Sequence, residues 1–276
     1  MTEKNLTVYK ANQVIEASYR LTKNEERVIL ACIGQVNSQE ALVTTDEFVL
    51  LASDFAQIFG VSKDKLQSVA KTLYQRSLTI HDPFPNKPRI KKLETRWISS
   101  IGYMPEDGKI KLCFAQDMLP FLGALKGEFT KYKLKHVAKM KSIYGNRLYE
   151  LLMQWQTIGK REVDIDWLKQ CFQIEEQYPD MADFKKRVLE PAIKDINEHS
   201  NLNVAWMQRK TGRRVTHLTF TFAEKAIEKP MRKPREKMIL GIKESEVVRL
   251  AKPGETWEAA AIRIKQEKMK AKQAVG

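Results

Sequence analysis

Residues 53–63 read Ser-Asp-Phe-Ala-Gln-Ile-Phe-Gly-Val-Ser-Lys, a spacing that predicts a helix, a tight turn and the start of a second helix. Ala56 is small enough for two helices to cross closely. Gly60 can adopt the positive φ angle that ends the first helix, and Ser62 can cap the second. The stretch therefore predicts a helix-turn-helix.

The second of these helices has one apolar face and one polar face. Its inward side is expected to carry Leu66, Val69, Ala70, Leu73 and Ser77. Its outward side is expected to carry Asp64, Ser68, Lys71, Thr72 and Gln75. Because this outward side is nearly neutral, we expect Lys71 to make an auxiliary contact with DNA.

The segment before the helix-turn-helix predicts another helix. Thr22 and Glu25 have the spacing of a capping box, and apolar residues then recur at helical intervals. A helix is therefore expected over about residues 22–36.

The segment after the helix-turn-helix predicts a wing. A proline-rich loop at 82–88 precedes two strand-like runs, at 95–103 and 109–114, which flank an Asp-Gly turn. A hairpin directly after a helix-turn-helix is typical of a winged helix. We expect the first such domain over residues 1–126.

The same order of elements follows a second time. Helices are expected over Leu134–Trp155, 166–172 and 182–197. A hairpin is expected next, with strands at 203–209 and 215–222 and a turn at 210–213. Val204 and Trp206 of this hairpin are expected to face a core together with Leu218, Phe220 and Phe222. Pro191 falls inside the last helix, where it removes a backbone hydrogen bond and should cause a kink. We expect a second winged-helix domain over residues 127–224.

The last residues, 225–276, differ in character from the two domains. A basic, proline-interrupted linker comes first, and Thr256 then caps a helix with Trp257, Ala260, Ala261 and Ile264 on one side. We expect this helix to pack on the body or fray, and a partner-binding helix is the alternative. The expected fold class is thus α+β, with two tandem winged helices and a basic C-terminal tail.

Composition points to a polyanionic partner. Lys and Arg outnumber Asp and Glu by 48 to 34, which gives a net charge of +14 and favours nucleic acid. With no run of about 18 apolar residues and no leader peptide, we expect a cytoplasmic protein that does not enter membranes. Cys32, Cys113 and Cys171 are far apart in apolar segments and are expected to be reduced core thiols.

The sequence gives little support for catalysis. Its four histidines form no His-x-His pair of the kind that holds a metal in rolling-circle nickases. No G-x-x-x-x-G-K-[ST] loop is present, which argues against a P-loop ATPase. We expect no enzyme activity, no metal site and no cofactor, and a metal-dependent nuclease is the less favoured alternative.

Cations gather on two elements of the second domain. Its third helix should present Lys185, Lys186, Arg187 and Lys194 outward. Its hairpin should present Arg209, Lys210, Arg213 and Arg214, with no carboxylate among them in the sequence. We therefore expect the second domain to hold double-stranded DNA more strongly than the first.

Three ordered motifs resemble a known family. The first is Asn12-Gln-Val-Ile-Glu-Ala17 with Tyr19, Leu21, Glu25 and Arg27; the second is Tyr144-Gly-Asn-Arg-Leu-Tyr-Glu-Leu-Leu152. The third runs from Asp183-Phe-Lys-Lys-Arg187 through Ile196-Asn197 to Lys210-x-Gly212-Arg213-x-x-Thr216-His217 and Phe220. The chain resembles the iteron-binding plasmid replication initiators of the F plasmid type over residues 10–222.

The resemblance implies a monomer that binds direct repeats at a plasmid origin and a dimer that represses its own gene. It also implies dimerisation through the first domain and recruitment of the host initiator and helicase. Lys185, Lys186 and Arg187 match the basic triplet that starts the family's recognition helix. Because lysine cannot make the bidentate guanine contact of arginine, Arg187 is the best candidate for reading a base. A winged-helix transcription regulator is the main alternative, and an origin nickase is the third.

Overall fold

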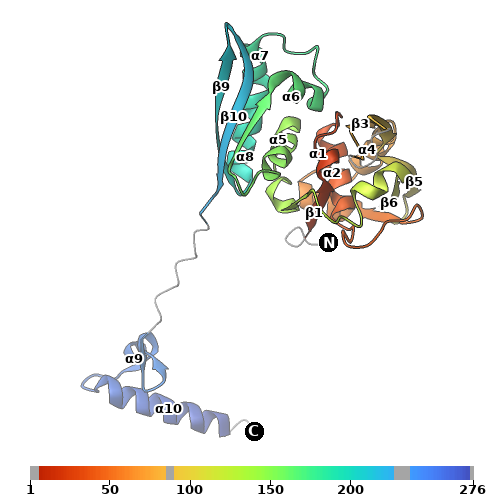
Figure 1. The fold of residues 1–276 in the computed structure, drawn as a ribbon. Coiled ribbons are helices and arrows are strands. Elements are labelled where there is room, and N and C mark those ends of the chain that lie inside the picture. Colours follow the sequence, from red (N-terminus) through yellow and green to blue (C-terminus); the bar gives the residue numbers. More distant parts are fainter. Residues whose placement is uncertain (1–5, 85–89, 227–236, 274–276) are drawn as a thin grey trace. The chain divides into compact units, whose positions relative to one another are not determined.

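Two three-stranded antiparallel sheets of the same topology organise residues 1–225 of the computed structural model (Figure 1). The first has the order β2 (Phe48–Leu51), β6 (Lys109–Phe114), β5 (Ile98–Met104). The second has the order β8 (Lys160–Asp164), β10 (Arg214–Glu224), β9 (Leu202–Thr211). In each sheet the last strand of the three lies in the middle, which is the wing arrangement.

Three helical segments accompany each sheet. Those of the first are α2 (Lys23–Ile33), α3 (Ala52–Phe59) and α4 (Lys65–Leu73). Those of the second are α5 (Ile143–Met153), α6 (Ile165–Phe172) and a segment built of α7 (Met181–Phe184), a π-type turn (Lys185–Leu189) and α8 (Glu190–His199). The order helix, strand, helix, helix, hairpin thus occurs twice. The expected α+β fold with two tandem winged helices is confirmed.

The structure describes residues 6–84, 90–226 and 237–273. Most of the proline-rich loop predicted at 82–88 and most of the basic linker lie outside the described residues. The boundary between the domains at 126/127 stays a prediction.

Local signals of the first domain are largely confirmed. The Thr22 hydroxyl accepts from the Glu25 N–H and the Glu25 carboxylate accepts from the Thr22 N–H at 2.7 Å, so the capping box forms, although α2 ends at Ile33 rather than at 36. Gly60 ends α3 with φ +64°. The prediction that Ser62 caps the next helix was wrong, because α4 begins only at Lys65 and the Ser62 hydroxyl donates to the Asp64 carboxylate.

Two other expectations in this domain were wrong. Ser77 is exposed on strand β3 (Ser77–His81), because α4 already ends at Leu73. The strand expected at 95–103 is two strands, since β4 (Lys92–Arg96) pairs with β3 while β5 pairs with β6. The chain changes partner at Trp97, which is fully buried and packs edge-to-face on Tyr19 with ring centroids 4.9 Å apart.

A pair of strands that the sequence did not indicate joins the start of the chain to the segment that follows the first sheet. β1 (Thr7–Ala11) pairs antiparallel with β7 (Phe129–Lys133), and a short helix, α1 (Asn12–Ile15), follows β1 directly. A short 3-10 helix at Gln116–Phe121 lies between β6 and β7. The first strand of the chain is therefore held by a segment about 120 residues later.

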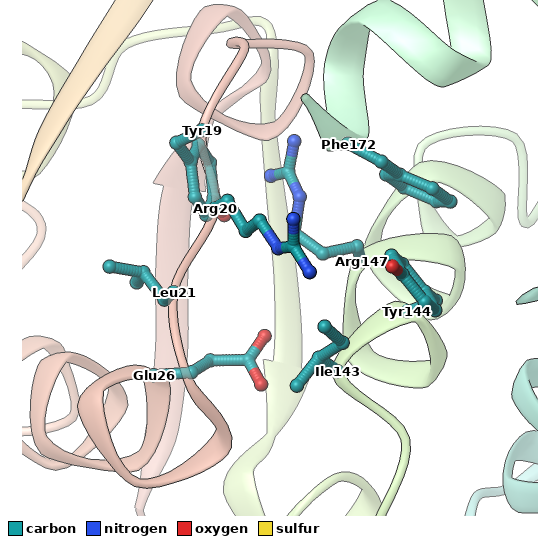
Figure 2. Close-up of a pocket in the computed structure, with 8 residues that line it drawn as sticks. All are labelled: Tyr19, Arg20, Leu21, Glu26, Ile143, Tyr144, Arg147 and Phe172. Carbon is teal, nitrogen blue, oxygen red and sulfur yellow. The ribbon is translucent and has the colours of Figure 1, made fainter. Parts of the chain in front are cut away.

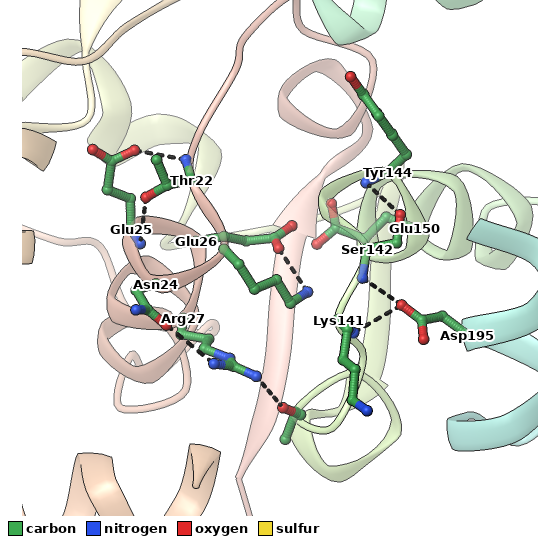
Figure 3. A network of polar contacts seen from close by, with 12 residues as sticks. Thr22, Asn24, Glu25, Glu26, Arg27, Lys141, Ser142, Tyr144, Glu150 and Asp195 are labelled. Carbon is green, nitrogen blue, oxygen red and sulfur yellow. Dashed lines mark hydrogen bonds and ion pairs between the residues drawn. The ribbon is translucent and has the colours of Figure 1, made fainter. Parts of the chain in front are cut away.

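The long helix expected over Leu134–Trp155 is interrupted. A 3-10 turn covers Leu134–His136, and α5 starts afresh at Ile143 with Ser142 as its cap. The reason is the Asp195 carboxylate, which accepts from the backbone N–H groups of Lys141 (2.8 Å) and Ser142 (Figure 3). These N–H groups therefore bond to a side chain instead of to helix carbonyls. The spacing of apolar residues did not reveal this break.

The hairpin of the second domain forms as expected, with small differences. Val204, Leu218, Phe220 and Phe222 are buried and Trp206 is half-buried. The turn is shorter than predicted, since Thr211 pairs with Arg214 and only Gly212 and Arg213 lie between the strands. The three cysteines are free, with Cys32 and Cys171 buried and Cys113 half-buried, as expected of core thiols.

Residues 226–276 form a separate unit. It contains β11 (Met238–Ile239), β12 (Ile242–Lys243), α9 (Glu244–Leu250) and α10 (Trp257–Gln273). Ala260, Ala261 and Ile264 of α10 pack with Ile242 and Val247 inside the unit. Trp257, expected on the same side, is instead 51% exposed. Among the described residues, no helix is both long and apolar enough to cross a membrane.

Buried polar groups join the two winged helices. The Lys10 ammonium lies 2.7 Å from the Glu150 carboxylate, and both side chains are almost fully buried. Burial by itself lowers the pKa of Lys10, but the Glu150 carboxylate, with smaller contributions from Tyr19 and Glu26, outweighs this effect and the pKa is raised. Tyr132 donates its hydroxyl to the same carboxylate. Strand β1 is thereby bonded to helix α5.

Arg147 is the second link of this junction. Its guanidinium donates to the carbonyls of Ala17 (2.7 Å) and Cys171 (3.1 Å) and lies 3.6 Å from the centre of the Tyr19 ring. Figure 2 shows Arg147 on α5 reaching toward the chain that carries Tyr19 and Arg20. The cavity between these segments has about 10 Å³ of free space, so the junction is closely packed.

We expect Lys10→Met to lower the free energy of unfolding by about 3–5 kcal/mol, because it leaves the Glu150 carboxylate buried without its cation. Urea unfolding of the full chain measures this. Lys10→Met/Glu150→Gln should be more stable than Lys10→Met alone, since the amide carries no charge yet still accepts from Tyr132. Lys139→Met, at an exposed lysine, is the control and should change stability by no more than about 0.5 kcal/mol. A loss as small as that in Lys10→Met itself would contradict the assignment.

Candidate nucleic-acid interface

The third helical segment of the second domain runs without a gap from Met181 to His199. Pro191 has no N–H to donate to the Arg187 carbonyl, and a π-type turn at Lys185–Leu189 directly precedes it. A widened turn thus lies immediately before the place where the kink was predicted, and the kink itself stays a prediction. The apolar side chains of this segment are buried: Phe184, Val188, Leu189, Ala192, Ile193 and Ile196.

Two buried or half-buried polar side chains hold this segment in place. Asp195 binds the backbone at the start of α5, as described above, and Gly145 of α5 lies against it. Asn197 accepts from the Val204 N–H at 2.7 Å and donates to the Val204 carbonyl at 2.9 Å. Asn197 therefore joins the end of α8 to strand β9 as a neighbouring strand would. These contacts of Asp195 and Asn197 therefore fix the position of the helix that carries the outward cations.

All four predicted cations of this helix are at least partly exposed to solvent. Lys186, Arg187 and Lys194 are exposed, and Lys185 is half-buried with its ammonium 5.5 Å from the centre of the Trp206 ring. Arg187 makes a loose pair with Asp183 (3.5 Å). Lys194 lies 3.7 Å from Glu198. The contact with Trp206 brings the start of the helix beside the wing strand β9.

The four predicted cations of the wing are exposed but not equivalent. Arg209 pairs with Glu162 of β8 at 2.8 Å, and hydrogen bonds from Arg209 and Thr219 lower the pKa of that carboxyl. Arg214 donates to both carboxylate oxygens of Asp166, at 2.8 and 3.0 Å. Arg209 and Arg214 of the wing are therefore paired with carboxylates that lie outside the hairpin.

The tip of the wing carries the remaining two cations. Lys210 and Arg213 are exposed, and within residues 6–84, 90–226 and 237–273 no ion pair joins either of them. Gly212 lies between them in the turn, with φ +63°. Lys210 and Arg213 are thus the wing cations best able to meet phosphate groups.

Sequence reasoning missed Glu162 and Asp166 because it did not find strand β8. Both are exposed residues of the strand and helix that run beside β10, and the pairing of β8 with β10 brings them under the wing. Lys71 lies on α4 of the other winged helix, where it is exposed as expected. In the described part of the chain, no group of three or more His, Cys, Asp or Glu side chains could hold a metal ion.

Comparison with known families decides what kind of protein this is. Residues 7–153 match the model described as initiator replication protein, WH1, and residues 164–222 match the model described as initiator Rep protein, WH2. The chain belongs to this replication initiator family. Helix α5, with the second sequence motif, falls inside the WH1 match, and the recognition helix and wing fall inside the WH2 match.

Individual relatives agree with the family match. A replication initiation protein of Escherichia coli is 29% identical over 227 residues, which are 78% of this chain and 69% of the relative. The PI protein of Escherichia coli is 24% identical over 255 residues, 79% of this chain and 83% of the relative. The crystal structure of Pi initiator protein in complex with iteron DNA has the same fold, with a TM-score of 0.69 and 21% identity over 81% of this initiator and 99% of that chain.

We expect Arg187→Ala and Arg213→Ala to weaken DNA binding in different ways. Arg187→Ala should cost roughly 1–3 kcal/mol of discrimination at one or two base pairs, because a side chain on the recognition helix can reach base edges. Arg213→Ala should weaken all sequences alike, because a wing tip meets the backbone. Competition binding with point-mutated sites separates the two. Equal effects on every sequence from both changes would refute the division.

Proposed function

We propose that this chain is a plasmid replication initiator that binds direct repeats, or iterons, at its origin. One observation carries the proposal: in a chain of the initiator family, the exposed start of the recognition helix and the free tip of the wing lie on one domain. The Pi initiator protein, which has this fold, was crystallised in complex with iteron DNA. A helix for the major groove and a cationic hairpin beside it suit duplex DNA.

We assign unequal shares of the binding to the two domains. Residues 127–224 would read the DNA with Lys185, Lys186, Arg187 and Lys194 of the helix and Arg209, Lys210, Arg213 and Arg214 of the wing. Residues 1–126 would add an auxiliary contact through Lys71 and would carry the dimer contact. The different charge of the two wings supports this assignment, since the second hairpin carries Arg209, Lys210, Arg213 and Arg214, whereas the first has Glu106 and Asp107 beside Lys109 and Lys111.

The same proposal covers the partners. The initiator would bind repeats as a monomer, repress its own gene as a dimer and recruit the host initiator and helicase to the opened origin. It would act in the cytoplasm, without a cofactor and without cutting DNA. The family match and the sequence motifs support these roles.

Binding to repeat DNA should fall steeply with salt. Each phosphate that the protein neutralises should change log K by about −0.9 per unit of log salt, because bound counterions are released. A fluorescence anisotropy titration on a duplex that carries one repeat, at several salt concentrations, measures the slope. Lys210→Ala/Arg213→Ala should make the slope less negative by about two such increments. A flat salt response would overturn the proposal.

Supercoiled origin plasmid should stay closed when incubated with the protein and Mg²⁺ or Mn²⁺. The expectation follows from the sequence, which offers no His-x-His pair to hold a metal beside a tyrosine. Agarose gels report relaxation, and denaturing gels report a covalent adduct. Nicked product, or an adduct on any tyrosine, would place the chain among the origin nickases instead.

A further inference from the structure

A groove of about 300 Å³ lies where the β1–β7 pair meets the base of the second wing. Its walls include Tyr9, Lys131, Lys133, His136, Gln156 and Asn201. A volume of this size is at the lower end of the range of small-molecule sites. None of these residues belongs to the recognition helix or to the wing tip.

The strand pairing places aromatic and cationic side chains on one face. Tyr9 is paired with Lys131 and Thr7 with Lys133, so these four side chains point the same way, while their sequence neighbours are buried. Phe129 continues the row, 37% exposed, with its ring centroid 6.0 Å from that of Tyr9. Aromatic rings interleaved with lysines on an open strand pair are typical of surfaces that stack bases and hold phosphates.

The segment that contributes Lys131 and Lys133 to the groove is rich in lysine. Six lysines fall within residues 126–141, all exposed: Lys126, Lys131, Lys133, Lys135, Lys139 and Lys141. The segment contains a single carboxylate, Glu128. Such a cluster attracts an anion.

The back wall offers groups that hydrogen-bond without a net positive charge. The Tyr149 hydroxyl donates to Asn201 Oδ1 at 2.8 Å, and the side-chain amides of Asn201 (3.1 Å) and Gln156 both donate to the same Glu224 oxygen, which orients the Asn201 and Gln156 side chains. Burial, together with Lys135 and Lys133, lowers the pKa of His136 and so favours the neutral ring. Amide, imidazole and carboxylate groups of this kind can bond the polar edge of a base.

The groove is remote from the proposed duplex-reading surface. Glu224 pairs with Leu202 at the base of the hairpin, whereas Arg213 lies in the turn at its other end. The strand between them has ten residues, which at roughly 3.3 Å per residue separates the two by about 30 Å. A duplex on the wing tip therefore leaves the groove free.

From these contacts we infer that the groove binds a nucleotide. Tyr9 stacks on its base, Lys131 and Lys133 hold its phosphate, and Gln156 and Asn201 meet its base edge. The nucleotide is either free or one residue of an unpaired DNA strand. Binding of an unpaired strand would extend the proposed function, because opening an origin exposes single strands. Binding of a nucleotide in the groove does not itself depend on the proposed function.

Two kinds of probe distinguish an unpaired DNA strand from a free nucleotide. Full-length protein is titrated against fluorescein-labelled (dT)15 by anisotropy and against ATP and dTTP by calorimetry. Lys131→Ala/Lys133→Ala should weaken binding of whichever of these ligands the parent binds by roughly tenfold or more. The matched control, Lys126→Ala/Lys139→Ala, removes the same charge from the same segment outside the groove lining and should weaken it less than about threefold. Binding of the oligonucleotide alone identifies a strand, and binding of ATP or dTTP identifies a free nucleotide.

Tyr9 variants test stacking separately from charge. Tyr9→Phe keeps the ring and should bind as the parent does, whereas Tyr9→Leu should lose roughly tenfold. Circular dichroism confirms that each variant is folded. Equal losses in the two lysine pairs, or competition by poly-glutamate as strong as by (dT)15, would show a general cationic or acidic-protein surface and overturn the inference.

The repeat duplex is measured on the same variants. The groove variants should bind it within about twofold of the parent, because the wing tip is remote. A matching loss on the duplex would make the groove part of the duplex surface and overturn the inference. Failure of the parent to bind repeat DNA, with groove-dependent binding of (dT)15 or nucleotide intact, would refute the proposed function and leave the groove assignment standing.

Discussion

The ion pair between Lys10 and Glu150 is the contact on which the arrangement of the two winged helices depends. Removing two charges from water is costly, and only a close partner in the right geometry offsets the cost. Lys10 is on strand β1 and Glu150 on helix α5, so neither charge is satisfied unless β1 packs against α5. The same layer contains polar atoms with no bonding partner among the described residues, in Asn146, Arg147 and Glu150. The junction therefore selects one orientation strongly while keeping some polar groups unsatisfied, at a cost in stability.

A second set of contacts fixes the position of the recognition helix and the wing. Asp195 ties α8 to the start of α5, and Asn197 ties it to the wing strand β9. Because the recognition helix is held by its inward side, its outward cations need no contacts of their own to be oriented. The wing is held differently, since Arg209 and Arg214 lie over carboxylates of β8 and α6. These exposed pairs contribute little to stability, but they keep two of the four wing cations near the protein and leave the tip to meet a phosphate backbone.

The net charge of +14 is therefore not spread evenly over the protein. Residues 126–141 contribute six lysines against one carboxylate, and residues 226–276 contribute 13 Lys and Arg against seven Glu. Residues 160–225, by contrast, have 12 Lys and Arg against 11 Asp and Glu, so their cations are gathered on the recognition helix and wing rather than in excess. Two separated cationic surfaces on one docked body can engage two anionic ligands together, since neither covers the other. The charge pattern thus suits a protein that holds a duplex and meets a second ligand nearby.

The sequence by itself determined the helix-turn-helix at 53–63, the capping box at Thr22, the hairpins and the cations of the recognition helix and wing. Each of these signals lies within a few residues, because caps, tight turns and amphipathic faces are local. Only the tertiary structure decided the pairing of β1 with β7, the break before α5, and the partners of Lys10, Arg209 and Arg214. These depend on groups between about 50 and 140 residues away, such as Asp195 for the break and Glu150 for Lys10. Apolar spacing continues unchanged across the break at Ser142, so a pattern of hydrophobic residues cannot show that a distant carboxylate has taken the backbone N–H groups there.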